Sequence, residues 1–375
     1  MLIGIPRETR PGETRVAATP ETVRKITTSG KHAVVVESGA GMPSSVPDAA
    51  FEAAGARIGG AADALGADLV LKVRAPTAEE IAKLKRDAVV IGLLDPYDAA
   101  GVEALARSGV TGFAMERLPR ISRAQSMDVL SSQANIAGYK AVIVAANEYG
   151  RFMPMLMTAA GTVKAARVLV LGVGVAGLQA IATAKRLGAV IEASDVRPSV
   201  KDQVESLGGK WVDVPYETDE EREIAEGAGG YARPMPAAWM QRQAAIIAER
   251  CKQMDIVITT ALIPGRPAPR LVKADTVAAM KPGAVIVDLA VEQGGNVEGS
   301  EPDQVAIRNG VKIVGMTNLA ALVAADASAL YARNLLNFLA LSLDVKTGDY
   351  ALARDDEIVQ ATLVCENGSL TTFKT

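Results

Sequence analysis

The chain has 375 residues, which is long for one domain, so we expect two domains. Hydrophobic residues make up 49% of the chain, and the abundance of Ala, Val and Gly suits parallel sheets packed closely against helices. The net charge is −3 with both signs interspersed, and the absence of a basic block or basic amphipathic helix argues against nucleic-acid binding and membrane-surface binding. Two distant cysteines, Cys251 and Cys365, without metal-ligand spacing, indicate a reduced cytosolic compartment and no metal site.

The N-terminal third of the chain alternates apolar strands with amphipathic helices, which predicts a doubly wound α/β domain. The expected strands are Leu2–Ile5, Ala33–Val36, Leu69–Val73, Ala88–Leu94 and Gly112–Met115. The expected helices are Glu21–Ser29, Ala49–Ala54, Ala78–Leu84 and Ala100–Arg107. The N-terminal MLIGIPRE is interpreted as a core strand and not as a signal peptide. Since no G-x-G-x-x-G turn follows the first strand, we expect this domain to bind no dinucleotide.

A long helix over about Arg123–Tyr149 leads into a second α/β domain, and a helix over about Ala324–Leu343 returns to the first. The second domain's expected strands are Val168–Leu171, Val190–Ala193, Lys210–Val214, Ile256–Thr259, Ala284–Asp288 and Lys312–Val314. In the tail, Ile358–Phe373, the segment Glu366–Ser369 between two short β-like runs predicts a hairpin. We therefore expect two doubly wound Rossmann-like domains, residues 1–125 with 330–375 and residues 126–329, joined by two long helices around a ligand-binding cleft.

The second domain opens with strand, glycine turn, helix, strand and acid. Gly172, Gly174 and Gly177 form G-x-G-x-x-G directly after Val168–Leu171, and Asp195 closes the next strand 23 residues after Gly172. The first glycine permits a tight turn, the second lets the backbone approach a pyrophosphate, and the third lets the helix pack closely. The residues expected at the pyrophosphate are Gly172, Gly174, Val175, Ala176 and Gly177, because a helix N-terminus attracts phosphate.

Asp195 can accept hydrogen bonds from a ribose diol, and its charge repels a 2′-phosphate, which favours NAD(H) over NADP(H). The alternative is a glycine-rich packing turn with an incidental aspartate. The apolar run Val168–Ala184 is long enough to suggest a membrane span, but its three glycines and Gln179 argue against one. We therefore expect a dinucleotide site in a soluble chain.

The connection over residues 216–235 is long and contains an acidic run followed by Gly227, Gly229, Gly230 and Tyr231. One interpretation is a mobile lid whose Tyr231 closes over the nucleotide. The other is a solvated surface insertion. Composition does not decide between them.

The chain has one histidine, His32, which lies before a strand and is expected to be a surface or edge residue rather than a catalyst. A dehydrogenase that oxidises an alcohol or amino acid needs a group to handle the proton. Hydride transfer between two nicotinamides has no such requirement, because the cofactors supply the chemistry and the protein supplies position. A strong NAD site without a good acid or base therefore favours a second cofactor as hydride partner.

The string PRISRAQSMD lies where the first domain ends and the long helix begins. Ser122 and Gln125 form an S-x-x-Q capping box, which needs no functional explanation. Arg120, Gln125 and Asp128 place a cation, an amide and an anion around one helix start. Together these three side chains have the chemistry to orient a carboxamide and a ribose.

PRISRAQSMD closely resembles the signature loop of the NAD(H)-binding component of proton-translocating nicotinamide nucleotide transhydrogenase. Further strings agree, namely IGIPRE, RVAATP, GVGVAGLQAIATAKRLGA, TTALIPGRPAP and VIVDLAVEQGGN. The resemblance implies that Arg120, Gln125 and Asp128 lie at the nicotinamide with Ser131 nearby, and that the Gln reaches toward NADP(H) on another domain. It also implies that Tyr231 closes near the nucleotide. The string TALIPG follows a strand, and the family places such a segment, here Thr260, Ala261 and Leu262, beside NAD(H); the alternative is a Pro-Gly turn.

Alanine dehydrogenase shares the fold, the RVAxTP string and the glycine turn, so an NAD-dependent amino-acid dehydrogenase is the alternative. That enzyme requires a Lys and a His in the first domain. Here Arg74 stands where the lysine is expected, Leu94 where the histidine is expected, and Glu292 where an aspartate is expected, while Arg15 is common to both families. These departures favour the transhydrogenase resemblance.

A transhydrogenase also needs a membrane-embedded, proton-conducting component and an NADP(H)-binding component. This chain has neither transmembrane helices nor a second nucleotide motif, so we expect both on separate chains. The resemblance implies a homodimer that is cytoplasmic and peripheral on the inner face of the cell membrane. An NAD-sensing subunit that regulates a membrane partner is the non-enzymatic alternative.

Overall fold

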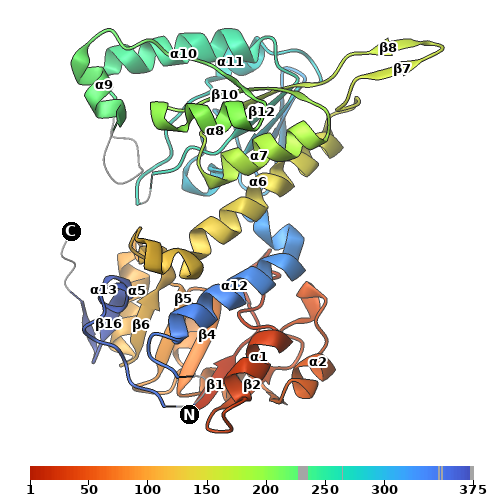
Figure 1. Cartoon of the computed structure of the whole chain (residues 1–375). Coiled ribbons are helices and arrows are strands. Elements are labelled where there is room, and N and C mark those ends of the chain that lie inside the picture. Colours follow the sequence, from red (N-terminus) through yellow and green to blue (C-terminus); the bar gives the residue numbers. More distant parts are fainter. Residues whose placement is uncertain (227–234, 264, 345–346, 348, 372–375) are drawn as a thin grey trace. The chain divides into compact units, whose positions relative to one another are not determined.

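The structure, a computed structural model, describes residues 1–226, 235–263, 265–344, 347 and 349–371 (Figure 1). The chain divides into two compact units, Met1–Gln133 with Ala320–Thr375, and Ala134–Leu319. The first division falls inside helix α6 (Val129–Glu148) and the second lies shortly before helix α12 (Ala324–Leu339), compared with the expected boundaries near residues 126 and 330.

The first unit contains one sheet of eight strands in the order β17-β16-β6-β5-β4-β1-β2-β3. Its strands are β1 (Leu2–Ile5), β2 (Ala33–Glu37), β3 (Ala56–Gly59), β4 (Leu69–Arg74), β5 (Val89–Leu93), β6 (Thr111–Ala114), β16 (Leu363–Glu366) and β17 (Ser369–Leu370). Its helices are α1 (Pro20–Thr27), α2 (Asp48–Ala53), α3 (Ala61–Leu65), α4 (Ala78–Ile81), α5 (Ala99–Arg107), α12 and α13 (Glu357–Thr362), with 3-10 turns η1 (Met42–Ser44), η2 (Met115–Arg117), η3 (Ser122–Met127) and η6 (Ala320–Val323). The first six strands are parallel, and the order in which they are added to the sheet reverses between β1 and β4, which is the doubly wound topology.

The five strands expected in this unit are confirmed, with ends that differ by a residue or so. The sequence analysis missed β3 and α3, which are too short to show a clear period. The tail hairpin is confirmed: β16 and β17 pair antiparallel, and Asn367 and Gly368 between them both have positive φ, 52° and 77°. The beginning of the tail, however, is helix α13 and not a strand.

The second unit contains a sheet of seven strands in the order β11-β10-β9-β12-β13-β15-β14. Its strands are β9 (Arg167–Leu171), β10 (Val190–Ser194), β11 (Lys210–Trp211), β12 (Ile256–Thr259), β13 (Val285–Asp288), β14 (Val305–Arg308) and β15 (Val311–Val314), and a separate hairpin is formed by β7 (Leu156–Thr158) and β8 (Gly161–Val163). The helices that follow α6 are α7 (Val175–Arg186), α8 (Lys201–Ser206), α9 (Asp219–Glu226), α10 (Ala237–Cys251) and α11 (Ala274–Ala278), with 3-10 turns η4 (Pro198–Val200) and η5 (Val291–Gln293). All strands of the large sheet are parallel except the edge strand β14.

The central strands of the second unit were predictable because they lie buried in its core. Val168–Leu171 is buried on both faces, as a parallel strand between two helical layers must be. Both β14 and the β7–β8 hairpin were missed, and β11 has two residues where five were expected. These edge elements bury little apolar surface and so leave a weak pattern in the sequence. The expected α/β class with two Rossmann-like domains is confirmed.

Candidate nucleotide-binding site

The glycine turn connects β9 to α7 in the second unit. Gly172 has a φ of +94°, and a Cβ there would lie 2.8 Å from Thr260 Oγ1 and 3.0 Å from the Ala261 nitrogen. A side chain at this position would therefore be strained and would collide with the loop after β12. The strand order of the sheet reverses between β9 and β12, and doubly wound sheets bind ligands at this point.

The other two glycines have different surroundings. A Cβ at Gly177 would lie 2.0 Å from the Gly172 carbonyl oxygen, so this glycine is needed to let α7 pack against the turn. A Cβ at Gly174 would meet no described heavy atom within 4 Å. The side chain of Val175, the first residue of α7, is 39% exposed. The α7 N-terminus thus faces open space, which suits a phosphate group at the positive end of the helix.

Asp195 follows β10 and is bound to the glycine turn. Its Oδ2 accepts a hydrogen bond from the Val173 nitrogen at 2.7 Å. Arg197 binds the same carboxylate through two donors, with Nε to Oδ1 at 2.9 Å and Nη2 to Oδ2 at 2.9 Å. The sequence analysis missed Arg197, although a base two residues after the acid was the available signal. This ion pair partly neutralises the charge that was expected to repel a 2′-phosphate.

The loop after β12 contains the predicted residues Thr260, Ala261 and Leu262. Thr260 Oγ1 donates to the Gly172 carbonyl at 2.9 Å, so the loop and the glycine turn are directly joined. The Ala261 nitrogen donates to Asn296 Oδ1 at 3.0 Å, and the Leu262 side chain is 41% exposed. Strand topology therefore brings the predicted pyrophosphate, ribose and TALIPG residues together at one edge of the sheet.

The predicted nicotinamide loop lies in the first unit. Arg120 and Gln125 are exposed, and Asp128 accepts from the Ser131 nitrogen at 2.9 Å and from Ser131 Oγ at 2.5 Å. Asp128 therefore caps α6, which begins at Val129 and not at the expected Arg123. The predicted Ser122–Gln125 capping box is wrong, because η3 (Ser122–Met127) begins without a side-chain cap. Asp128 instead accepts from a free backbone N–H, that of Ser131, in the first turn of the longer helix.

Side chains of helix α12 and of the C-terminal segment bond to the predicted nicotinamide loop and hold it in place. The Ser126 carbonyl accepts hydrogen bonds from Asn334 Nδ2 at 2.8 Å and Asn337 Nδ2 at 2.9 Å. Arg123 makes a two-pronged ion pair with Asp356 at 2.5 and 3.1 Å. The sequence analysis missed both asparagines, whose three-residue spacing on a helix was the available signal. Their effect is to fix the backbone between Gln125 and Asp128.

Tyr231 lies outside the described residues. Within the same connection, Asp219–Glu226 forms α9, and Arg242 of α10 pairs with Glu217 at 2.8 Å and with Glu221 at 2.5 Å. Tyr216 stacks on buried Trp239 with ring centroids 6.2 Å apart. The described ends of the connection therefore contact the second unit at Tyr216 and Glu221, while residues 217–220 are exposed.

The corresponding edge of the first unit holds a buried ionic network. Lys72 Nζ lies 2.9 Å from Glu80 Oε1 and 3.4 Å from Glu8 Oε2. Arg15 donates from Nε and Nη2 to Glu13, at 2.7 and 2.6 Å, and from Nη1 to Gln133 at 2.9 Å. His32 is buried, contrary to expectation, and directly precedes the amino end of β2.

Glu116 lies at the same edge of the sheet, and its carboxyl group should make the stability of the first unit depend on pH. Its carboxylate accepts from the Leu94 and Asp95 nitrogens, but burial outweighs these bonds and raises its pKa to about 7. Because the folded protein binds this proton more tightly than the unfolded chain, the stability contributed by this group falls as pH rises from about 4.5 to 7. We expect the unfolding temperature of Glu116→Gln, relative to wild type, to increase between pH 5 and pH 8. A pH-independent difference in thermal melts would contradict this.

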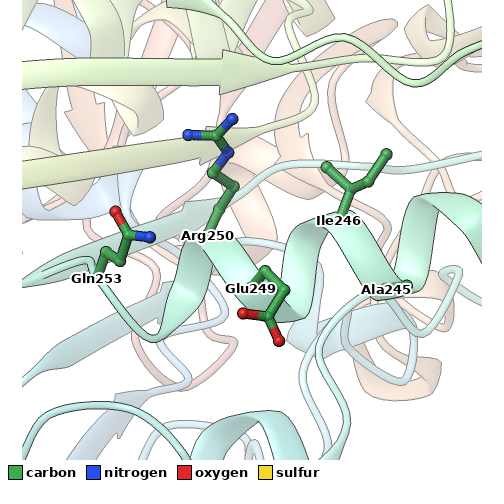
Figure 2. A pocket seen from close by; sticks show the side chains of 5 residues that line it. All are labelled: Ala245, Ile246, Glu249, Arg250 and Gln253. Atoms are coloured by element: carbon green, nitrogen blue, oxygen red, sulfur yellow. The ribbon is translucent and has the colours of Figure 1, made fainter.

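One shallow surface depression of about 450 Å³ lies elsewhere on the second unit (Figure 2). It is lined by Ala245, Ile246, Glu249, Arg250 and Gln253. The first four belong to the end of α10, and Gln253 lies in the turn that leads to the amino end of β12, whereas the glycine turn lies at the carboxyl ends of the strands. We therefore do not assign the depression to the nucleotide site.

Among the described residues, no group of three His, Cys, Asp or Glu side chains has a metal-binding arrangement.

Comparisons with known proteins agree with this geometry. The alanine dehydrogenase/PNT N-terminal domain matches residues 4–137, and the C-terminal domain of the same family matches residues 141–372. An NAD(P) transhydrogenase alpha subunit of Rhodospirillum rubrum is 54% identical, covering 99% of this chain and 97% of the relative. The solved structure of a transhydrogenase from Sinorhizobium meliloti is 50% identical with a TM-score of 0.85, covering 99% of this chain and 98% of that one.

Alanine dehydrogenase of Mycobacterium tuberculosis is also related, at 35% identity over 80% of this chain and 76% of that enzyme. The identity to both transhydrogenase proteins is higher and extends over nearly the whole chain. The resemblance inferred from the sequence strings is therefore confirmed. Both domain matches and all three relatives lead to one assignment: the chain belongs to the alanine dehydrogenase/PNT family.

Proposed function

We propose that this chain is the NAD(H)-binding subunit of a proton-translocating NAD(P) transhydrogenase. The observation that carries the proposal is the glycine turn of the second unit, where Gly177 packs on Gly172 and Asp195 bonds to Val173. This arrangement fits the pyrophosphate and adenosine ribose of a dinucleotide. Bound NAD(H) exchanges a hydride directly with NADP(H) on a partner subunit.

The chain's own residues bind and orient the nucleotide in this proposal. The pyrophosphate is held by Gly172, Gly174, Val175, Ala176 and Gly177. Asp195 receives the adenosine ribose, and Thr260, Ala261 and Leu262 line the nucleotide beside the glycine turn. Arg120, Gln125, Asp128 and Ser131 orient the nicotinamide, and Tyr231 closes the site. None of these side chains is required to move a proton, which agrees with the placement of the sole histidine beside the amino end of β2.

The partners follow from the same proposal. A membrane-embedded subunit conducts protons, a further subunit binds NADP(H), and conformational change couples the two processes. This chain is then cytoplasmic and is held at the inner face of the cell membrane by those subunits. None of the helices described in the structure is long and apolar enough to span a bilayer.

We also propose a homodimer. Figure 1 shows the β7–β8 hairpin extending from the sheet of the second unit. Large apolar side chains on and before it are exposed, with Phe152 at 55%, Met155 at 61% and Met157 at 74%. Exposed apolar surface of this kind is typical of a protein interface. Sedimentation should give twice the chain mass, and a monomer at micromolar concentration would contradict the proposal.

The amino-acid dehydrogenase alternative requires a lysine and a histidine at positions where the first unit has Arg74 and Leu94. Leu94, where a histidine is expected, is an apolar side chain with 3% exposure and cannot transfer a proton. The donors of Arg15 already bond to Glu13 and Gln133 within the chain. Incubation with NAD and alanine should therefore produce no NADH. Sustained NADH formation would instead establish the dehydrogenase.

Asp195→Ala should reduce the preference for NADH over NADPH about tenfold, because the variant loses a ribose acceptor and the negative charge that repels a 2′-phosphate. The measurement is the ratio of the two dissociation constants from titrations of reduced-nicotinamide fluorescence. Arg197→Ala is the matched variant: it restores the uncompensated charge of Asp195 and should increase the preference. If the ratio of the two dissociation constants were unchanged in both variants, Asp195 would not bind the ribose.

A further inference from the structure

Asn296 bonds to the backbone of the loop that follows β12. Its side chain is fully buried. Its Oδ1 accepts from the Ala261 nitrogen at 3.0 Å, while its Nδ2 donates to the carbonyls of Ala261 and Pro269, each at 2.8 Å. One carboxamide therefore binds both polar backbone groups of Ala261, and no other described side chain bonds to them.

Asp288 holds Asn296 in place. The carboxylate, at the end of β13, is also fully buried. Its oxygens accept from the backbone nitrogens of Asn296 at 3.2 Å and Val297 at 3.1 Å, and from Thr259 Oγ1 at 3.1 Å. Gly295 allows this close approach, because it has a φ of +80° and a Cβ there would lie 2.6 Å from Asp288 Oδ2. Buried polar groups whose hydrogen bonds are all made in this way are held in a single geometry.

The position of this network on the sheet indicates its purpose. Asp195 follows β10, on one side of β9, and the Ala261 loop follows β12, on the other side. A dinucleotide whose adenosine lies at Asp195 and whose pyrophosphate lies at the glycine turn must extend its nicotinamide half toward β12. Because Asn296 accepts from the Ala261 N–H, this donor is not available to the nucleotide. The exposed Leu262 is the next residue along the loop.

We propose that Asn296, oriented by Asp288, is a positioning residue that fixes the Thr260–Leu262 loop against the glycine turn for the nicotinamide half of NAD(H). The inference rests on the proposed NAD(H) site. Asn296 does not touch the nucleotide in this proposal and acts through Ala261. Its removal should therefore affect ligands that reach past β9 and spare those that stop at the pyrophosphate.

The test compares NADH with ADP on the full-length chain. Asn296→Ala should weaken NADH binding about tenfold, which corresponds to about 1.4 kcal/mol, and should change ADP binding less than about twofold. Asn147→Ala is the matched control, because Asn147 is exposed on α6 in the same unit, and both affinities should stay at wild-type values. Calorimetric titration gives both constants, and thermal unfolding without ligand shows whether each variant is folded.

Thr260→Val is the second variant, because it removes only the bond from the loop to Gly172 and leaves the Asp288–Asn296 network intact. It should produce the same selective loss of NADH affinity, and it decides the question if Asn296→Ala does not fold. Equal losses for NADH and ADP, or no loss for either, in a folded variant would overturn the inference. Failure of the wild-type chain to bind NADH at all would instead overturn the proposed function.

Discussion

Gly174→Ala is expected to weaken NADH binding about a hundredfold, close to 2.7 kcal/mol, while the unfolding temperature of the free protein stays unchanged. A Cβ at Gly174 meets no described heavy atom within 4 Å, and the φ of −83° is open to alanine. The methyl group would instead enter the space in front of the α7 N-terminus, where the proposal places the pyrophosphate. Titration with NADH and thermal melts of the same samples measure the two effects.

Gly177→Ala is the contrasting variant. Its Cβ would lie 2.0 Å from the Gly172 carbonyl, so the turn must move whether or not nucleotide is present. We expect this variant to lose both NADH affinity and thermal stability. If Gly174→Ala bound NADH normally, the pyrophosphate would not lie at this turn.

Gln125→Ala is expected to slow hydride transfer about a hundredfold and to change NADH affinity less than about threefold. Misplacement of a reacting group by about 1 Å is sufficient for a rate loss of this size. The side chain is exposed on a loop whose backbone is fixed by Asn334, Asn337 and Arg123, so its removal should leave the fold unchanged. Single-turnover transfer rates and NADH titrations separate the two effects.

Asp128→Ala combines two effects, because Asp128 also caps α6 through Ser131. We expect it to slow hydride transfer as well, and to destabilise the fold by about 1 kcal/mol. Asp128→Asn keeps an acceptor for the Ser131 nitrogen and isolates the effect of charge. If Gln125→Ala lost NADH affinity strongly but turned over the bound nucleotide normally, this loop would not orient the nicotinamide.

The regions of the fold that could be predicted are those whose physics is local or periodic. Central strands such as Val168–Leu171 are continuous apolar runs because helices cover both faces of a parallel sheet. The glycine turn was predictable because Gly172 and Gly177 have no room for a side chain. In contrast, β3, β14 and the β7–β8 hairpin are short or lie at edges, and the start of α6 depended on which of two nearby polar residues capped it.

Two of the site residues that sequence reasoning missed act through tertiary contacts. Asn334 bonds to Ser126, and Asn296 bonds to Ala261, 35 positions earlier in the chain, whereas Arg197 pairs with Asp195 only two residues away. Even where two such residues share a helix face, as Asn334 and Asn337 do, their spacing does not identify the distant backbone group to which they bond. Such residues become visible only when the fold brings the partners together.

Hydride exchange with and without an NADP(H)-binding partner tests the central claim most directly. NADH and an oxidised NAD analogue are mixed with the chain alone, and then with NADP(H) and the NADP(H)-binding component of a transhydrogenase. We predict reduction of the analogue only in the second mixture, and its loss in Gln125→Ala. Absence of transfer in the complete mixture, together with NADH formation from an amino acid by the chain alone, would contradict the account and identify a dehydrogenase.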